Sequence, residues 1–207
     1  MDDCQRWRGV NLEYCPLCRN VLNSENVQTM MGRRLAKAVA LARGRHARVQ
    51  HGVTGGAGLR LGRRVGIHAL HGASIEIGDR VEIGEGTSII AQTGATIIIG
   101  DDVFISGMCI IAAAEWIGIG CDSMVAELVC IRDHDHDPDQ PPRSGAVLRA
   151  PVRIGDRCWI GSKASIVRGG QVGDDSVVGA HALVNRAIPA GCVAAGVPAV
   201  VKRRKSR

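Results

Sequence analysis

Aromatic side chains are scarce in this sequence. Phe, Tyr and Trp make up 2% of the 207 residues, and Phe104 and Tyr14 are the single Phe and the single Tyr. A globular core of this size usually contains several such rings, because each of them fills a large volume. Their shortage argues against an ordinary mixed core and favours a narrow interior of stacked aliphatic and small side chains.

Long apolar runs are also missing. No stretch approaches the ~18 consecutive apolar residues of a membrane-spanning helix, and the opening residues MDDCQRWRG lack the apolar segment of a secretory signal. We therefore expect a cytoplasmic protein with no membrane insertion. In that reducing compartment the eight Cys residues remain thiols.

Acidic residues are outnumbered, since 20 Asp and Glu stand against 26 Lys and Arg, for a formal net charge of +6. The basic residues gather towards both ends, between Arg33 and Arg48 and between Lys202 and Arg207. Such clusters are typical of solvated termini or of a site for a phosphate-bearing ligand. Their distribution favours a small phosphate-bearing ligand, and we expect no nucleic acid as a partner.

A repeat of six residues is the strongest pattern present. Its aliphatic positions are Ile154, Ile160, Ile166, Val172, Val178 and Val184. A helix repeats every 3.6 residues and a strand every two, so a strict period of six indicates short strands separated by regular corners. Three hexads make one triangular coil of eighteen residues. The sequence therefore predicts an all-β protein, a parallel β-helix.

The distances between coil starts show where residues are inserted. Aliphatic residues before Gly mark the starts as Leu61, Ile77, Ile99, Ile119, Ile154 and Val172, at intervals of 16, 22, 20, 35 and 18 residues. In each coil longer than eighteen residues, the extra residues come after the start of the third hexad. We therefore predict three insertions that leave the prism at the same corner. Cys109, Cys121 and Cys158 fall on small or packed repeat positions, where a thiol acts as a small apolar side chain.

The N-terminal segment has two features of its own. Cys4, Cys15 and Cys18 supply three thiols, whereas a structural zinc site needs four ligands, so packed or free thiols are the favoured interpretation. Residues 30–43 have the pattern of a basic amphipathic helix, and such a helix can cover the open first coil.

The largest excursion, residues 132–151, is polar and rich in Asp and Pro. It contains His134 and His136 among Asp133, Asp135 and Asp137. A neutral imidazole has a pKa near the working pH, and an adjacent carboxylate can fix its tautomer and stabilise the cation. The cluster is therefore a candidate general base, with a solvated loop as the alternative interpretation.

A more specific pattern fills the C-terminal half. It begins with PVRIGDRCWIG at Pro151, continues in hexads, and ends with AIP at Ala187 and AGVPA at Ala195. Over residues 75–203 the sequence resembles the hexapeptide-repeat acyltransferases, and within them the O-acetyltransferase branch of maltose, galactoside and polysaccharide acetyltransferases. The resemblance implies left-handed coils, a homotrimer with active sites between subunits, and acetyl-CoA as acyl donor.

The resemblance also assigns roles to residues. His134 matches the catalytic base that takes the proton of the acceptor hydroxyl in a ternary complex. Asp133 and Asp135 are both candidates to orient it, and we assign Asp135 and His136 to acceptor binding. The CoA contacts implied are Trp159, Ser162 through its backbone amide, Ala180 along the pantetheine, Asn185 in place of a Thr, and Lys202 or Arg203 at the nucleotide end.

We therefore predict a left-handed parallel β-helix with an N-terminal helical segment and a basic C-terminal tail, divided into residues 1–55, 56–190 and 191–207. Its expected function is acetyl-CoA-dependent O-acetylation of a sugar or glycosylated small molecule, without a metal. One alternative is an amino-sugar N-acyltransferase. An alternative of another class is a β-helix metalloprotein of the carbonic anhydrase kind, but such sites need three His, and residues 99–116 contain none.

Overall fold

The computed structural model describes residues 38–42 and 54–205. Internal contacts divide the chain into two units, Met1–Val39 and Ala40–Arg207. Residues 38–42 are helical, while the rest of the helix expected at residues 30–43 lies outside the described residues, as do Cys4, Cys15 and Cys18.

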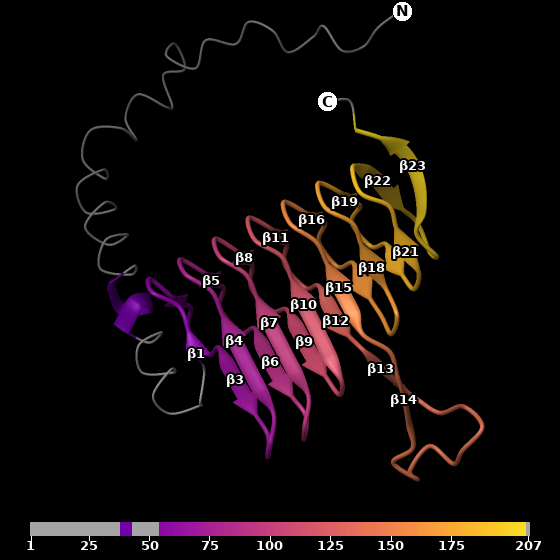
Figure 1. Cartoon of the computed structure of the whole chain (residues 1–207), viewed down its shortest axis with the longest axis horizontal. Helices are drawn as coiled ribbons and strands as arrows, with labels where there is room; N and C mark the ends of the chain where they lie inside the picture. The colour runs from indigo at the N-terminus through magenta and orange to yellow at the C-terminus, as the bar shows by residue number, and fades with distance from the viewer. Residues whose placement is uncertain (1–37, 43–53, 206–207) are drawn as a thin grey trace, which may run out of the picture. The chain divides into compact units, whose positions relative to one another are not determined.

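Residues 54–205 form a β-helix in which the chain visits three sheets in turn (Figure 1). Each sheet collects one strand per coil, and neighbouring strands pair in parallel. Sheet A contains β1 (Thr54–Gly55), β4 (Ser74–Ile77), β7 (Thr96–Ile99), β10 (Trp116–Ile119), β15 (Val152–Ile154), β18 (Gln171–Val172) and β21 (Ala187–Ile188).

Sheet B contains β2 (Arg60–Leu61), β5 (Glu82–Ile83), β8 (Phe104–Ile105), β11 (Met124–Val125), β16 (Trp159–Ile160), β19 (Val177–Val178), β22 (Cys192–Ala195) and β23 (Val200–Arg204). Sheet C contains β3 (Gly66–Ala69), β6 (Ser88–Ala91), β9 (Ile110–Ala113), β12 (Cys130–Arg132), β17 (Ser165–Ile166) and β20 (Leu183–Val184). Two further strands, β13 (His134–His136) and β14 (Val147–Arg149), form an antiparallel hairpin. The predicted parallel β-helix is confirmed.

The interior is filled by the aliphatic residue of each hexad. Sheet A aligns Ile77, Ile99, Ile119, Ile154 and Val172 in register, and each is at most 2% exposed. Burying one such side chain contributes about 1.5–3 kcal/mol. Cys109 and Cys158 share this interior, and burial raises the pKa of both thiols. Cys121 is instead half-buried at the corner between sheets A and B.

The first coil begins earlier than the sequence predicts. Gly55 of β1 pairs with Ile77, whereas Leu61 lies in β2 and pairs with Ile83 of sheet B. Leu61 is therefore not a coil start, and the first coil is 22 residues long, like the second. The prediction failed because Gly55 stands where the later coils have an aliphatic residue.

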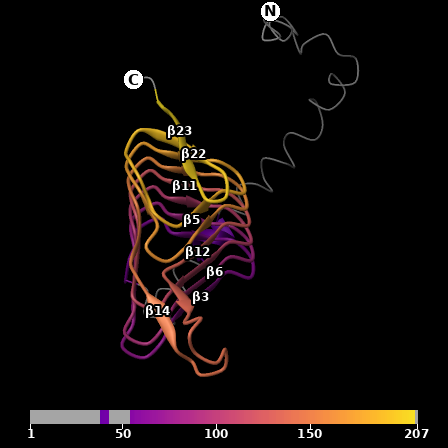
Figure 2. The same cartoon turned by 90° about the vertical axis from the view of Figure 1, so that its right-hand side faces the viewer.

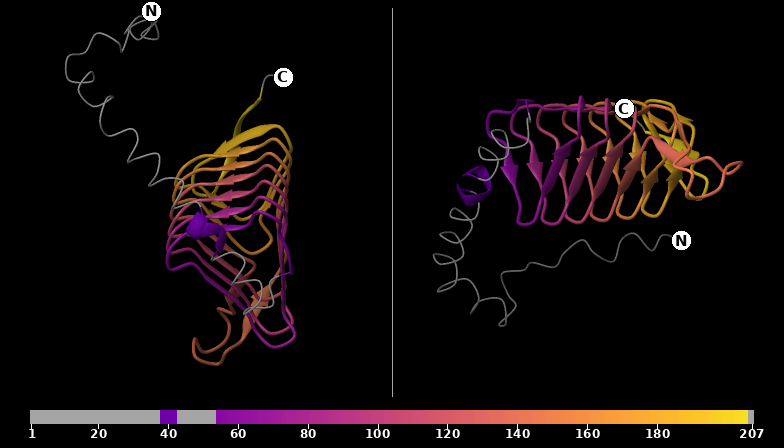
Figure 3. Two further views of the ribbon diagram at one scale, coloured as in Figure 1. Left: turned by 90° about the vertical axis from the view of Figure 1, so that its left-hand side faces the viewer. Right: turned by 90° about the horizontal axis from the view of Figure 1, so that it is seen from below.

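Of the three predicted excursions, one leaves the prism as a loop. In the coils that start at Ile77 and Ile99, the surplus lengthens the strands on both sides of the corner between sheets C and A. Strands β6, β7, β9 and β10 have four residues each, whereas β16 to β21 have two each. The third surplus forms the β13–β14 hairpin, which projects from this edge of the stacked coils (Figures 2 and 3).

The Gly-Asp pair that opens most coils has a steric cause. The amide of Asp156 donates to Oδ1 of Asp174 in the following coil at 3.0 Å. A Cβ on Gly155 would overlap that carboxylate oxygen and lie 2.7 Å from the amide nitrogen of Asp174. Gly is required because the following coil approaches this closely.

The C-terminal residues close the last coil. The backbone of Leu183, at the end of sheet C, donates to Gly196 and accepts from Ala199. Strand β23 then returns antiparallel to β22 at the end of sheet B. The basic side chains of this strand, Lys202 and Arg203 among them, are exposed.

We predict that Gly155→Ala lowers the free energy of unfolding by about 2–3 kcal/mol, because the added methyl group has to displace the backbone and carboxylate of Asp174. Denaturant titration of the purified variant measures the loss. Gly66→Ala is the matched control, since the nearest atom to its Cβ would be Nε2 of the His68 side chain at 3.1 Å, and the next atoms lie at 3.6 Å or more. Equal stability of the two variants would contradict the steric role of Gly155.

Candidate active site

The corner between sheets C and A brings together residues from successive coils. Sheet C aligns Ile89, Ile111 and Ile131 in register. Three positions after each of these residues the chain has Gln92, Ala114 and His134, so these three are stacked at one corner. The hairpin β13–β14 starts here.

Asp133 is a fully buried carboxylate at this corner, with 0% exposure. Its Oδ1 accepts from the amide of Ala114, and its Oδ2 accepts from the amides of Glu115 and Trp116, each at 2.7 Å. Burying a carboxylate is costly unless it is hydrogen-bonded, and three consecutive N–H groups meet that need. The carboxylate is therefore held rigidly by the preceding coil.

The same carboxylate orients His134. Asp133 Oδ1 lies 3.0 Å from His134 Nδ1, and the imidazole side chain is 18% exposed. Because a carboxylate only accepts hydrogen bonds, the imidazole donates through Nδ1. The lone pair of the neutral ring is then on Nε2, which makes Nε2 the atom that can take a proton.

Asp135 does not share this role. Its carboxylate lies 2.9 Å from Arg132 and 3.5 Å from Arg168, both of which are partly exposed. Of the two Asp candidates for orienting His134, the geometry selects Asp133. Asp135 instead ties the start of the hairpin to the next coil, an exposed interaction of modest strength.

Two more predicted residues lie at or near the same corner. His136 is exposed on β13, two residues beyond His134. Asn185 is exposed between β20 and β21, where its Oδ1 accepts from Arg186 at 3.4 Å. Both can be reached from solvent.

The remaining predicted residues lie elsewhere. Ser162 and Ala180 occupy the corner between sheets B and C in adjacent coils, and the amide of His181 donates to the carbonyl of Ser162 at 2.9 Å. The Ser162 hydroxyl donates to Glu127, which lowers the pKa of that carboxyl. Trp159 is 54% exposed on β16.

A single chain therefore does not assemble the predicted site. Asp133 and His134 follow the end of β12, whereas Ser162 and Ala180 precede β17 and β20, so the two groups lie at opposite edges of sheet C. A site that uses both groups needs the corner of one chain to face the opposite corner of another.

A ridge of exposed apolar side chains runs along sheet B and its corner with sheet C. Phe104, Met124 and Trp159 are consecutive partners on sheet B. Next to them Met108 and Leu128 lie at the corner and Ile110 begins β9, and all six are between 38% and 57% exposed. We call these six residues the apolar ridge; contiguous apolar surface of this kind is typical of an interface.

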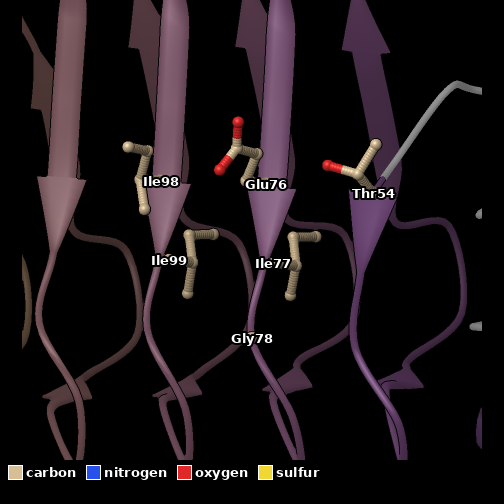
Figure 4. A pocket seen from close by; sticks show the side chains of 6 residues that line it. All are labelled: Thr54, Glu76, Ile77, Gly78, Ile98 and Ile99. Atoms are coloured by element: carbon tan, nitrogen blue, oxygen red, sulfur yellow. The ribbon is translucent and has the colours of Figure 1, made fainter.

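Two hollows lie on sheet A. The first, of about 240 Å³, is lined by residues of β1, β4 and β7 and by Gly78 (Figure 4). The second, of about 190 Å³, includes Trp116, whose ring covers Gly118, and Arg153. Neither hollow includes a predicted site residue.

Within residues 38–42 and 54–205, no group of three or more His, Cys, Asp or Glu side chains is arranged to hold a metal ion. The same residues include no helix that is long and apolar enough to span a membrane.

Sequence reasoning missed Gln92 and the amides of residues 114–116. The Gln92 side-chain nitrogen lies 3.2 Å from His134 Nε2, although the two residues are 42 positions apart. Aligning the coils by their third hexads would have placed both residues at one corner. The backbone amides of residues 114–116 that bind Asp133 leave no trace in the side-chain pattern, so this alignment could not have found them.

Comparison with known proteins identifies relatives of part of the chain. Residues 151–185 match the family model described as the hexapeptide repeat of succinyl-transferase. Galactoside O-acetyltransferase of Escherichia coli is 38% identical over 88 residues, which are 42% of this chain and 43% of that protein.

Solved structures agree in fold. The hexapeptide-repeat acetyltransferase of Vibrio cholerae, complexed with acetyl-CoA, has a TM-score of 0.56 and 26% identity, covering 67% of this chain and 73% of that chain. An N-acyltransferase of Bacillus cereus, in complex with dTDP and coenzyme A, has a TM-score of 0.54 and 20% identity, covering 71% and 84%. At that identity the likeness extends to the fold alone.

The matches are partial in length. The chain spans between 31% and 53% of the curated relatives that it matches.

We predict that neutral His134 carries its proton on Nδ1 and that Asp133→Asn weakens this preference, because an amide can present its NH₂ group to Nδ1. Long-range ¹H–¹⁵N NMR of the imidazole reports the tautomer directly. Asp135→Asn is the control and leaves the tautomer unchanged, since Asp135 faces Arg132 and Arg168. An Nε2–H tautomer in the unsubstituted protein would contradict the assignment.

Proposed function

We propose that this chain, whose repeat region belongs to the hexapeptide-repeat acyltransferase family, is an acetyl-CoA-dependent O-acetyltransferase acting on a hydroxyl of a sugar or glycosylated small molecule. The observation that carries the proposal is the Asp133–His134 pair. A fully buried carboxylate holds Nδ1 of an imidazole whose side chain is 18% exposed, and this leaves the lone pair of Nε2 available as a base.

The chemistry that this pair supports is a direct transfer. His134 Nε2 takes the proton of the acceptor hydroxyl while the oxygen attacks the carbonyl carbon of the acetyl thioester. The carbon–sulfur bond breaks, and the CoA thiolate leaves with the proton that His134 returns. Asp133 stabilises the imidazolium between these two proton transfers.

The donor is expected along the corner of Ser162 and Ala180. Two stacked corners offer backbone groups to the amides of pantetheine, and the Ser162 amide is our candidate to stabilise the thioester oxygen. Trp159 and Asn185 are further candidate contacts. Lys202 and Arg203 on β23 supply positive charge for the phosphates. The Vibrio cholerae relative, crystallised with acetyl-CoA, supports this choice of donor.

We further propose that the chain works as a homotrimer in the cytoplasm. The two halves of the predicted site lie at opposite edges of sheet C, so a neighbouring copy can supply what one chain lacks. The apolar ridge offers surface for that contact, since burying it removes several large apolar side chains from water.

Replacing His134 with Ala should lower turnover by roughly a hundredfold or more, because the general base is lost, while acetyl-CoA binding stays near normal. Thiol release from acetyl-CoA across a panel of glycosides measures turnover, and calorimetry measures donor binding. Gln171→Ala, an exposed residue of β18 in sheet A, is the control and keeps full activity.

Two results would contradict the proposal. Full activity of the His134 variant would remove the assigned base. A product whose acetyl group survives mild alkaline treatment would indicate an amide, and hence transfer to an amino sugar, because esters hydrolyse under those conditions.

Met124→Glu should dissociate the trimer, since it places a carboxylate in the middle of the apolar ridge, where association would bury it. Light scattering after gel filtration measures the mass, and thiol release measures the accompanying loss of activity. Ile98→Glu, at an exposed site on the outer face of sheet A, away from the ridge and from the corner of His134, leaves the mass unchanged. A monomeric starting protein with full activity would refute the shared site.

A further inference from the structure

Among the described residues, the side chain of Gln92 is the polar partner of His134 Nε2, at a distance of 3.2 Å. This is the nitrogen whose lone pair the proposed reaction uses. A general base has to lie within about 2.6–3.2 Å of the group that it deprotonates. The carboxamide of Gln92 therefore occupies the position that the acceptor hydroxyl has to take.

The fold fixes the backbone of Gln92, whereas its carboxamide is held, among the described residues, by the contact with His134. Its amide donates to the carbonyl of Ala113, and its carbonyl accepts from the amide of Ala95, both at 2.8 Å. The residue is half-buried at the end of β6. An incoming molecule can displace the carboxamide without disturbing the coil.

The contact spans two coils, and a small residue between them permits it. Adjacent coils are about 4.8 Å apart, so the backbones of Gln92 and His134 are separated by roughly 10 Å. The residue between them is Ala114, which directly follows the strand positions that these registers align and is 9% exposed. Two long side chains can thus meet above it, and an acceptor that enters there touches both.

We propose that Gln92 is an acceptor-binding residue. Its carboxamide moves away from His134 Nε2 when the reacting hydroxyl binds there, and it then hydrogen-bonds a neighbouring oxygen of the acceptor. A carboxamide donates through its nitrogen and accepts through its oxygen, and a hydroxyl group does the same. The acceptor class is therefore a neutral molecule with neighbouring hydroxyls, such as a vicinal diol of a sugar ring. This inference rests on the proposed function and narrows its substrate.

The test compares unsubstituted protein with Gln92→Ala, using the methyl glycoside that the unsubstituted protein acetylates fastest and its monodeoxy analogues. The variant should raise the acceptor KM roughly tenfold, in line with the loss of one or two neutral hydrogen bonds, with little change in kcat. On the analogue that lacks the hydroxyl next to the reacting one, the two proteins should have the same KM.

Two readouts separate acceptor binding from a structural role. Slow hydrolysis of acetyl-CoA, with water as acceptor, should persist or rise in Gln92→Ala, since Nε2 is uncovered. Gln92→Glu places a carboxylate beside the imidazole, which favours the cation, raises the pKa of the base and moves the acidic limb of the kcat/KM profile to higher pH. Gln171→Ala, an exposed Gln of β18, should match the unsubstituted protein throughout.

The outcomes are distinct. An unchanged acceptor KM in a folded Gln92→Ala variant overturns the proposal and leaves the proposed function intact. An equal loss on every analogue and on hydrolysis also overturns it, in favour of a structural role. If His134→Ala retains both transfer and hydrolysis, the proposed function fails, and this inference fails with it.

Discussion

In the interior of the β-helix, the aliphatic side chain of each coil stacks on that of the next. The positions of the corner residues depend on this stacking. Each coil contributes one such residue per sheet, and the parallel register keeps them aligned from Ile77 to Val172. A shift of strand register by one residue would turn polar side chains into the interior. Every corner therefore lies at a fixed number of residues from a buried aliphatic residue. The corner that holds His134 inherits its position from Ile131, three residues earlier.

That rigidity explains how a buried carboxylate is tolerated. Asp133 directly follows β12, and the coil before it turns at the same place, so three consecutive amides point at its oxygens. The cost of desolvation is offset within the backbone, without a positive side chain. One oxygen of Asp133 also accepts from His134 Nδ1. The backbone amides therefore fix the carboxylate, and the carboxylate fixes the imidazole.

Much of this follows from the sequence, and the exceptions have physical causes. The hexads predict the coils, the core and the corner of His134, because burial requires the period of six. They do not distinguish a loop from longer strands, since four added residues divided between two strands preserve the register, as in β6 and β7. They place the first coil wrongly because Gly55 has no aliphatic side chain to mark it. Choosing Asp133 over Asp135 depends on two arginines, one of them from the next coil.

The position of the longest insertion is itself informative. A loop of this length costs conformational entropy and adds no core, yet it begins immediately after the buried Asp133 and returns to sheet A at Val152. Its first strand thus starts from the most firmly held carboxylate of this corner, while its far end is exposed. Under the proposed function, an acceptor beside this hairpin has His134, held through Asp133, on one side and exposed hairpin side chains on the other. The exposed side chains of the hairpin can therefore vary without altering the coils.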